Sequence, residues 1–197
     1  FAVVIMFDPI TGAPVAIMDG NYITGARTAA GSALATKVLA RENSEVLAVI
    51  GSGVQGKAHL QAIPRFRPIR EIRLAGRNSA NVQGLVDGLP AEVKNMTVIC
   101  SSYQEAIKGA DVICATTHSS EPVVYWDWLK PGAHVNSVGL NHDGQEVDPE
   151  IVKNSLLVVE SRKSALAPAP AGANEITSLI RDGSIDKNHV HAEIGEI

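Results

Sequence analysis

One stretch of this chain runs from an apolar segment directly into three spaced glycines. Residues 46–50, Val-Leu-Ala-Val-Ile, are followed without a gap by residues 51–56, Gly-Ser-Gly-Val-Gln-Gly, which fit the pattern G-x-G-x-x-G. A helix is expected over residues 57–63. Strand, tight turn and helix in this order are the context in which the glycine pattern predicts a dinucleotide-binding fold. The alternative is a glycine-rich turn in another kind of α/β protein.

Each glycine of the pattern has its own mechanical role in such a fold. Gly51 permits the sharp turn off the strand, Gly53 lets the backbone approach a pyrophosphate, and Gly56 lets the helix pack close to the sheet. The N-terminus of the helix offers free N–H groups and a partial positive charge to the phosphates. We therefore expect a dinucleotide to lie over this loop.

Beyond the loop, strand-like and helix-like segments alternate, which predicts an α/β fold with a Rossmann-type doubly wound parallel sheet. The further strands are expected at residues 69–75, 96–100, 111–115, 132–138 and 156–159, and the further helices at residues 78–89, 103–108 and 175–181. Before the loop, residues 3–7 and 14–18 predict a hairpin, and a helix is expected to begin at Thr24 as its cap. We assign the hairpin to another domain because it precedes the nucleotide fold.

Composition and charge exclude several classes of protein. The chain has 197 residues, 45% of them hydrophobic and 19% charged, which is ordinary for a globular protein. The net charge is −4 without a basic stripe, which argues against a nucleic-acid partner, and no apolar run is long enough to span a membrane. Cys100 and Cys114 lack a C-x-x-C neighbour, and no histidine pair has metal-ligand spacing with a carboxylate. We expect free thiols, a cytoplasmic location and no metal.

The loop after residues 69–75 carries the information on cofactor type. The position where an NAD-binding fold places an acid for the ribose holds Gly76, followed by Arg77, Asn78 and Ser79. An acid would bond the 2′-hydroxyl and repel a 2′-phosphate, whereas an arginine does the reverse. We therefore expect NADPH to be preferred over NADH. The alternative is that Arg77 stacks on the adenine or faces solvent.

The loops after the next two strands are expected to meet the nicotinamide and the substrate, because ligands bind beyond the carboxyl ends of the strands. Thr116 and Thr117 are small hydroxyl residues that could line the nicotinamide side. Gly139 permits a flat ring to approach, and Asn141 and His142 could face the substrate. His118 is a further candidate for this region, whereas His134 is expected to be a hydrogen-bonded core residue and His59 lies on the first crossover helix.

Motifs spread over nearly the whole chain resemble those of the ornithine cyclodeaminase and mu-crystallin family. The strings Arg-Thr-Ala-Ala at residues 27–30 and His-Val-Asn-Ser-Val-Gly at residues 134–139 are far more specific than the glycine loop. Matching segments also occur at residues 8–12, 18–20, 23–24, 35–37, 51–55, 115–117 and 192–196.

The resemblance implies a two-domain homodimer. We expect residues 1–24 to be a remnant of a substrate and dimerisation domain, residues 25–43 a connecting helix, and residues 44–197 the NAD(P)-binding domain. Because the chain opens with Phe1 in a strand-like run and closes at residues 192–197 without a stop signal, we expect it to be a piece of a longer protein with an incomplete active site.

The resemblance also implies residue roles. Arg27 matches the family arginine that binds the substrate carboxylate, and a guanidinium is the natural bidentate partner of that group. Thr28 matches a position near the cofactor phosphates, and Arg77, Asn78 and Asn81 match the 2′-phosphate loop of the NADPH-using branch. The full set of expected cofactor contacts is Thr28, Gly51, Gly53, Val54, Gln55, Gly56, Arg77, Asn78, Ser79, Asn81, Thr116, Thr117, Val138 and Gly139.

Two departures from the cyclodeaminase branch favour a reductase. That branch has an acid at the position of Asn141 and tends to hold NAD through an acid after the second strand, whereas this chain has an amide there and Gly76-Arg77. An amide cannot act as a general base at neutral pH. We expect NAD(P)H-dependent reduction of a cyclic ketimine carboxylate, with His142 as the candidate proton donor. The alternatives are ornithine cyclodeaminase, an amino-acid dehydrogenase, or a thyroid-hormone-binding or structural protein of the mu-crystallin kind.

Overall fold

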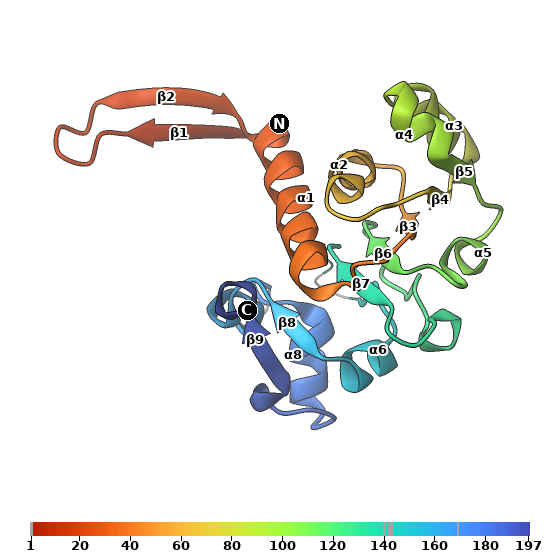
Figure 1. Ribbon diagram of the computed structural model, residues 1–197. Coiled ribbons are helices and arrows are strands. Elements are labelled where there is room, and N and C mark those ends of the chain that lie inside the picture. The colour runs from red at the N-terminus through yellow and green to blue at the C-terminus, as the bar shows by residue number, and fades with distance from the viewer. Residues whose placement is uncertain (1, 140, 142–143, 169) are drawn as a thin grey trace.

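The computed structural model describes residues 2–139, 141, 144–168 and 170–197, and a five-stranded parallel sheet forms its centre (Figure 1). The strand order is β5-β4-β3-β6-β7, with β3 (Val46–Ile50), β4 (Glu71–Ala75), β5 (Thr97–Ile99), β6 (Val112–Ala115) and β7 (His134–Ser137). Ile50 pairs in register with Ala75 on one side and Ala115 on the other, so three strands end together. The chain changes direction across the sheet between β3 and β6, which creates the switch point where such folds bind ligands.

Alternating side chains of the central strands β3 and β6 are buried on both faces of the sheet, as expected for a parallel sheet covered by helices. Leu47 and Val49 of β3 pack in one core cluster with residues of α2 (Val54–Ala62), α3 (Ser79–Asp87) and α4 (Ala91–Met96). Ala48 and Ile50 pack in a second cluster with residues of α5 (Tyr103–Ile107), α6 (Pro149–Asn154) and α8 (Asn174–Arg181). The doubly wound α/β fold expected from the sequence is confirmed.

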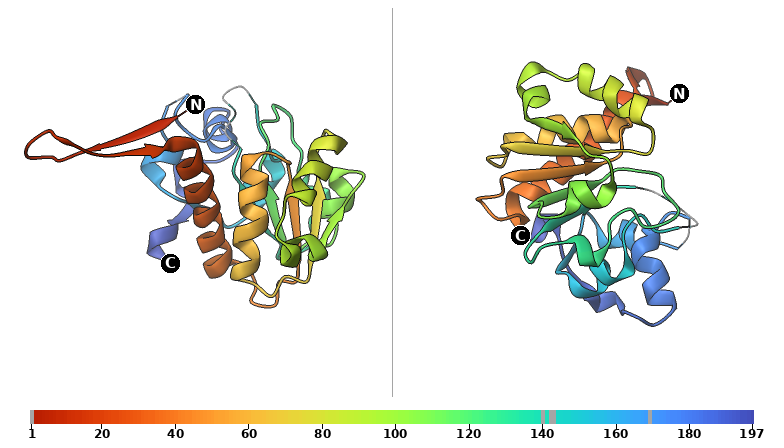
Figure 2. Two further views of the ribbon diagram at one scale, coloured as in Figure 1. Left: turned by 90° about the horizontal axis from the view of Figure 1, so that it is seen from above. Right: turned by 90° about the vertical axis from the view of Figure 1, so that its right-hand side faces the viewer.

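A separate antiparallel hairpin, β1 (Val3–Phe7) and β2 (Pro14–Asp19), projects from the body of the molecule (Figures 1 and 2). Its second strand leads directly into α1 (Gly20–Leu39), because the Asp19 carboxylate accepts the N–H groups of Asn21 and Tyr22 and caps the helix. The expected helix start at Thr24 is therefore wrong. Residues 19–21, Asp-Gly-Asn, are the N-cap and the first residues of the helix.

A chain of buried polar groups attaches α1 to the sheet. The His59 ring of α2 lies 2.9 Å from the Ser32 hydroxyl, and one turn later the Thr36 hydroxyl accepts a hydrogen bond of 3.0 Å from the Asn136 amide of β7. The His134 ring meets the Asn136 amide oxygen at 3.2 Å. Figure 2 shows α1 alongside α2. His134 is hydrogen-bonded, as expected, but it is only partly buried, whereas His59 is fully buried.

The C-terminal part of the chain forms a small layer of its own. β8 (Leu157–Val159) pairs in parallel with β9 (Val190–Glu193), so the expectation that residues 156–159 join the central sheet is wrong. Val159 of β8 and Val190 of β9 pack with Ile176 of α8 in a third cluster, so β8 packs with β9 and α8 rather than beside β7. The expected division of the chain into a domain remnant, a connecting helix and an NAD(P)-binding domain, with boundaries at residues 24 and 43, stays a prediction. The remaining short elements are α7 (Arg162–Ala165), η1 (Ile63–Arg65), η2 (Trp126–Trp128), η3 (Lys187–His189) and η4 (Ile194–Glu196).

None of the helices in the described part of the chain has the length and apolar character that a membrane crossing needs.

Candidate functional site

The turn between β3 and α2 is packed on one side and open on the other. Gly51 adopts φ +117°, and its N–H donates to the Ala75 carbonyl oxygen at 2.9 Å. A Cβ on Gly51 would lie 2.8 Å from the Thr116 carbonyl oxygen, and a Cβ on Gly56 would lie 2.1 Å from the Gly51 carbonyl oxygen. A Cβ on Gly53 would meet nothing within 4 Å. This is the geometry of a turn that a pyrophosphate can approach from the Gly53 side.

Two buried polar atoms beside this turn have no hydrogen-bond partner among the described residues: the hydroxyl oxygen of Thr28 and the amide oxygen of Gln55. They lie where α1 meets the start of α2, because the Gln55 amide nitrogen donates to the Thr24 carbonyl oxygen at 3.3 Å. Buried polar groups normally have partners. A hydroxyl can donate to a phosphate oxygen, and an amide oxygen can accept from a ribose hydroxyl. The residues around the turn therefore fit a dinucleotide.

The loop after β4 has no room for an acidic side chain at its first position. A Cβ on Gly76 would lie 2.7 Å from Cγ2 of Val82 and 3.2 Å from the Ser52 hydroxyl. The next residue, Arg77, is exposed and is in no ion pair with any residue that the structure describes. Asn78 caps α3, since its side-chain oxygen accepts the Asn81 N–H at 3.1 Å. The loop thus presents a positive charge directly after the position that an NAD-type fold gives to an acid.

A hollow of about 450 Å³ lies beside the turn, between the start of α2 and α3. Gly53, Val54 and Asn81 from the expected cofactor contacts line it together with Lys57. Lys57 was not expected from the sequence, although it is the first cation after the glycine pattern. The complete lining is Ser52, Gly53, Val54, Lys57, Ala80, Asn81, Gly84, Leu85 and Gly88.

The loops after β6 and β7 meet at the same edge of the sheet. The Thr116 hydroxyl donates to the Ile50 carbonyl oxygen at 2.8 Å, so this side chain joins β6 to the end of β3. The Val138 N–H donates to the Ala115 carbonyl oxygen at 3.0 Å, which extends the pairing of β7 with β6. Thr116, Thr117, Val138 and Gly139 are therefore brought together beside the glycine turn, as expected from the sequence. Their contacts with a cofactor stay a prediction.

A buried carboxylate, Glu146, lies between these two loops. One of its oxygens accepts the Thr117 N–H, and the other accepts the Gly139 N–H at 2.8 Å. Its own N–H donates to the carboxylate of Glu175 in α8 at 3.3 Å. Burial raises the pKa of Glu146, the Thr117 hydroxyl and the two N–H donors oppose that change, and the nearby Glu175 reinforces it. Burial likewise raises the pKa of Glu175. Neither acid was expected from the sequence.

The residues expected to face the substrate come from α1 and from the loop after β7. Arg27 is exposed on α1, two residues after Gly25, where an added Cβ would lie 3.2 Å from Val54. It is in no ion pair within the described part of the chain. The Asn141 amide donates to the His118 carbonyl oxygen at 3.3 Å, which links the two loops again. His142 lies outside the described residues.

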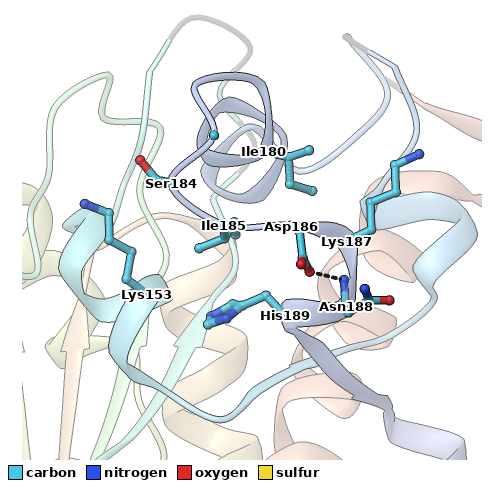
Figure 3. Close-up of a pocket in the computed structure, with 9 residues that line it drawn as sticks. Lys153, Ile180, Ser184, Ile185, Asp186, Lys187, Asn188 and His189 are labelled. Atoms are coloured by element: carbon cyan, nitrogen blue, oxygen red, sulfur yellow. Dashed lines mark hydrogen bonds between the residues drawn. The ribbon is translucent and has the colours of Figure 1, made fainter.

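A second hollow, of about 830 Å³, lies away from this edge, between α6, the end of α8 and η3 (Figure 3). Lys153, Asp186 and His189 are among the side chains around it, and the Asp186 carboxylate accepts the Asn188 N–H at 2.7 Å. None of the residues that line it is among the expected contacts. Across the residues that the structure describes, no three or more of His, Cys, Asp and Glu are placed to hold a metal ion.

The comparisons with known proteins agree on one family. The model of the ornithine cyclodeaminase/mu-crystallin family matches residues 1–197. The chain belongs to this family. Ketimine reductase mu-crystallin from Macropus fuliginosus, a relative, is 40% identical over 195 residues, which are 98% of this chain and 57% of that protein. The chain therefore spans less than two thirds of the length of this relative.

Solved structures support the same fold. Delta(1)-pyrroline-2-carboxylate reductase from Thermococcus litoralis, in complex with NADH and L-proline, superposes with a TM-score of 0.89 at 34% identity, over 98% of this chain and 59% of that one. An archaeal alanine dehydrogenase dimer with bound NAD gives a TM-score of 0.86 at 34% identity, over 98% and 58%. The family resemblance seen in the sequence is confirmed, and the roles of individual residues stay predictions.

Proposed function

We propose that the protein containing this chain uses NADPH, and NADH less well, to reduce a cyclic ketimine that carries a carboxylate, such as pyrroline- or piperideine-2-carboxylate. The observation that carries this proposal is an exposed arginine, Arg27, which pairs with no acid of the described residues and lies on the helix that packs against the glycine turn. It offers a carboxylate partner beside a dinucleotide site. The names of the similar proteins, a ketimine reductase and a pyrroline-2-carboxylate reductase, support the same chemistry.

The residues of this chain would divide the work between binding and orientation. A bound nicotinamide supplies a hydride, which adds to the imine carbon while a proton is added at the imine nitrogen. Arg27 would hold the substrate carboxylate, and Thr116 and Thr117 would line the nicotinamide side. Asn141 would face the substrate as a hydrogen-bonding group rather than as a base. His142 is the proposed proton donor or holder of a water molecule.

A substrate panel tests this proposal. The protein should oxidise NADPH, followed at 340 nm, when either ketimine carboxylate is added, and should release no ammonia from ornithine. Arg27→Ala should raise KM for the ketimine at least about tenfold, because a charge-assisted bond is lost. Arg65→Ala removes an exposed arginine from η1 and is the control. Turnover of ornithine alone, or of pyruvate with ammonia alone, would replace the proposal by a cyclodeaminase or an amino-acid dehydrogenase.

The proposed preference for NADPH depends on the loop after β4. Its support is that Val82 and Ser52 fill the space beside Gly76, while Arg77 leaves a positive charge exposed. A guanidinium is a strong partner for a 2′-phosphate.

Arg77→Ala should therefore weaken NADPH binding at least about tenfold and leave NADH binding nearly unchanged. Arg70→Ala is the control, because Arg70 is also exposed and lies at the other end of the same strand, where it pairs with Glu45. Titration calorimetry with both cofactors measures the difference. Equal losses for NADPH and NADH would show that Arg77 contacts something other than the 2′-phosphate.

We also propose that the whole protein is a cytoplasmic homodimer. The archaeal alanine dehydrogenase with a TM-score of 0.86 is described as a dimer, which supports this assembly. Cys100 and Cys114 are free thiols, as in a reducing compartment. Light scattering coupled to size-exclusion chromatography measures the mass in solution. A monomer at micromolar concentration would contradict the proposed homodimer.

A further inference from the structure

The Glu146 side chain links the two loops that follow β6 and β7 by hydrogen bonds to both. Its two oxygens accept N–H groups from residues that follow different strands, Thr117 after β6 and Gly139 after β7. Only 1% of Glu146 is exposed, so neither bond competes with water. Gly139 is fitted to this contact, because an added Cβ would lie 2.4 Å from Oε2 of Glu146.

The segment that carries Glu146 is itself fixed to α8. The Asn174 amide donates to the Gly144 carbonyl oxygen at 2.7 Å, and the Gln145 amide bonds the Ser178 hydroxyl. The Glu175 carboxylate then accepts the Glu146 N–H. Three consecutive residues are thus held by one helix, and the carboxylate reaches from this fixed base to both loops.

We propose that Glu146 is a positioning residue that sets the nicotinamide and substrate side of the active site through Thr117 and Gly139, without touching either ligand. This inference rests on the proposed reductase function for its kinetic readout. Asn141 lies two residues beyond Gly139, and Thr116 lies one residue before Thr117, so both loops expected to meet the ligands begin at the contacts that Glu146 makes. The adenosine side of the cofactor, around Gly53 and Arg77, has no contact with it in the described residues.

The proposal predicts that a change at Glu146 affects the nicotinamide side of the cofactor site but not the adenosine side. In Glu146→Gln the side chain keeps its volume, but its NH₂ group faces an N–H donor, so one of the two loops loses its acceptor. We expect kcat for ketimine reduction to fall about tenfold or more, as for loss of a charged hydrogen bond. Binding of 2′,5′-ADP, which contains only the adenosine side, should stay within about twofold of the wild-type affinity.

Glu175→Gln is the matched control. Glu175 is also a buried acid, and it contacts the Glu146 backbone but neither Thr117 nor Gly139. Glu175→Gln should lower Tm about as much as Glu146→Gln does. It should leave the ratio of NADPH to 2′,5′-ADP affinity unchanged. If Glu146→Gln does not fold, Glu146→Asp keeps the charge but withdraws the carboxylate by one methylene, and the same split is expected.

Two results would overturn the proposal. One is a kcat for Glu146→Gln equal to that of the wild type, and the other is a parallel loss of kcat and of 2′,5′-ADP affinity, which marks a general structural role. If the wild-type protein reduces no ketimine, the proposed function fails, but the affinity ratio still decides the role of Glu146. In that case Glu146→Gln should weaken NADPH and leave 2′,5′-ADP unchanged, and an unchanged ratio contradicts the inference.

Discussion

His134 is a titratable group held in an apolar setting at the start of β7. Burial lowers the pKa of its ring to about 4, and the bond with Asn136 only partly offsets this. The folded protein therefore keeps the ring neutral at a pH where the unfolded chain, with an ordinary value of 6.5, already binds a proton. The stability that comes from the neutral ring is present above pH 6.5 and is lost as the pH falls towards 4.

We expect Tm to fall between pH 7 and pH 4.5, and His134→Gln to flatten part of that slope. By linkage the wild-type loss from this group approaches on the order of 3 kcal/mol near pH 4. His59, whose pKa is also lowered by burial, remains in both proteins and accounts for a shared part of the slope. Differential scanning fluorimetry in a constant-ionic-strength buffer series measures the curves. Parallel curves for the two proteins would mean that His134 ionises equally in both states.

Local chemistry in the sequence points to part of the candidate site. Gly56 could be assigned because an added Cβ would collide with Gly51 of the same strand–turn–helix unit, whereas the crowding at Gly51 comes from Thr116 after β6. Arg77 could be found by counting from the end of a strand. Glu146 could not, because its partner Thr117 is 29 residues away and nothing local distinguishes a buried loop acid from a solvated one. Lys57 was missed because its position depends on where α3 lies.

Among the helices and strands, the start of α1 shows that one sequence pattern can fit two local structures. Aspartate, glycine and asparagine favour turns and helix caps alike, so residues 19–21 predict either a break or an N-terminus. The structure decides for the second, because Asp19 caps the helix directly after β2. β8 shows another limit, since a three-residue strand carries no information about which sheet it joins.

The cap gives a direct test. Asp19→Ala should lower the free energy of unfolding by about 1 kcal/mol, because two N–H groups of the first turn lose their acceptor. Thr24→Ala is the matched control at the start that the sequence suggested, and it should change stability by less than about 0.5 kcal/mol because its side chain is exposed within the helix. Urea denaturation followed by circular dichroism measures both. A larger loss for Thr24→Ala would place the true helix start there.

In the molecule as a whole, the hairpin side chains are exposed, whereas those of the central sheet are buried. The cross-strand pair Ile5 and Ile17 is 48% and 74% exposed, whereas Ile72 and Ile113 in the sheet are fully buried. Figures 1 and 2 show the hairpin extending away from the layers that form the core. The stability of this chain therefore comes from the sheet and its helices.

Replacing the pair by Ile5→Thr and Ile17→Thr together should leave Tm of this 197-residue chain within about 2 °C of its starting value. Ile113→Ala in β6 should instead cost about 3 kcal/mol, because a core cavity is created. Scanning calorimetry of the three proteins makes the comparison. A loss for the double variant similar to that of Ile113→Ala would mean that the hairpin side chains are buried in solution.

Gly76 also constrains how cofactor use can change during evolution. An acid at this position, the simplest step towards NAD, collides with Val82. Shortening Val82 first relieves the collision but opens a cavity at a core residue that is 1% exposed, at about 2 kcal/mol. Either substitution alone, an acid at position 76 or a shorter side chain at position 82, is therefore disadvantageous. An acid can therefore enter this loop readily only in a protein with stability to spare, so the packing beside Gly76 keeps the position free of an acid.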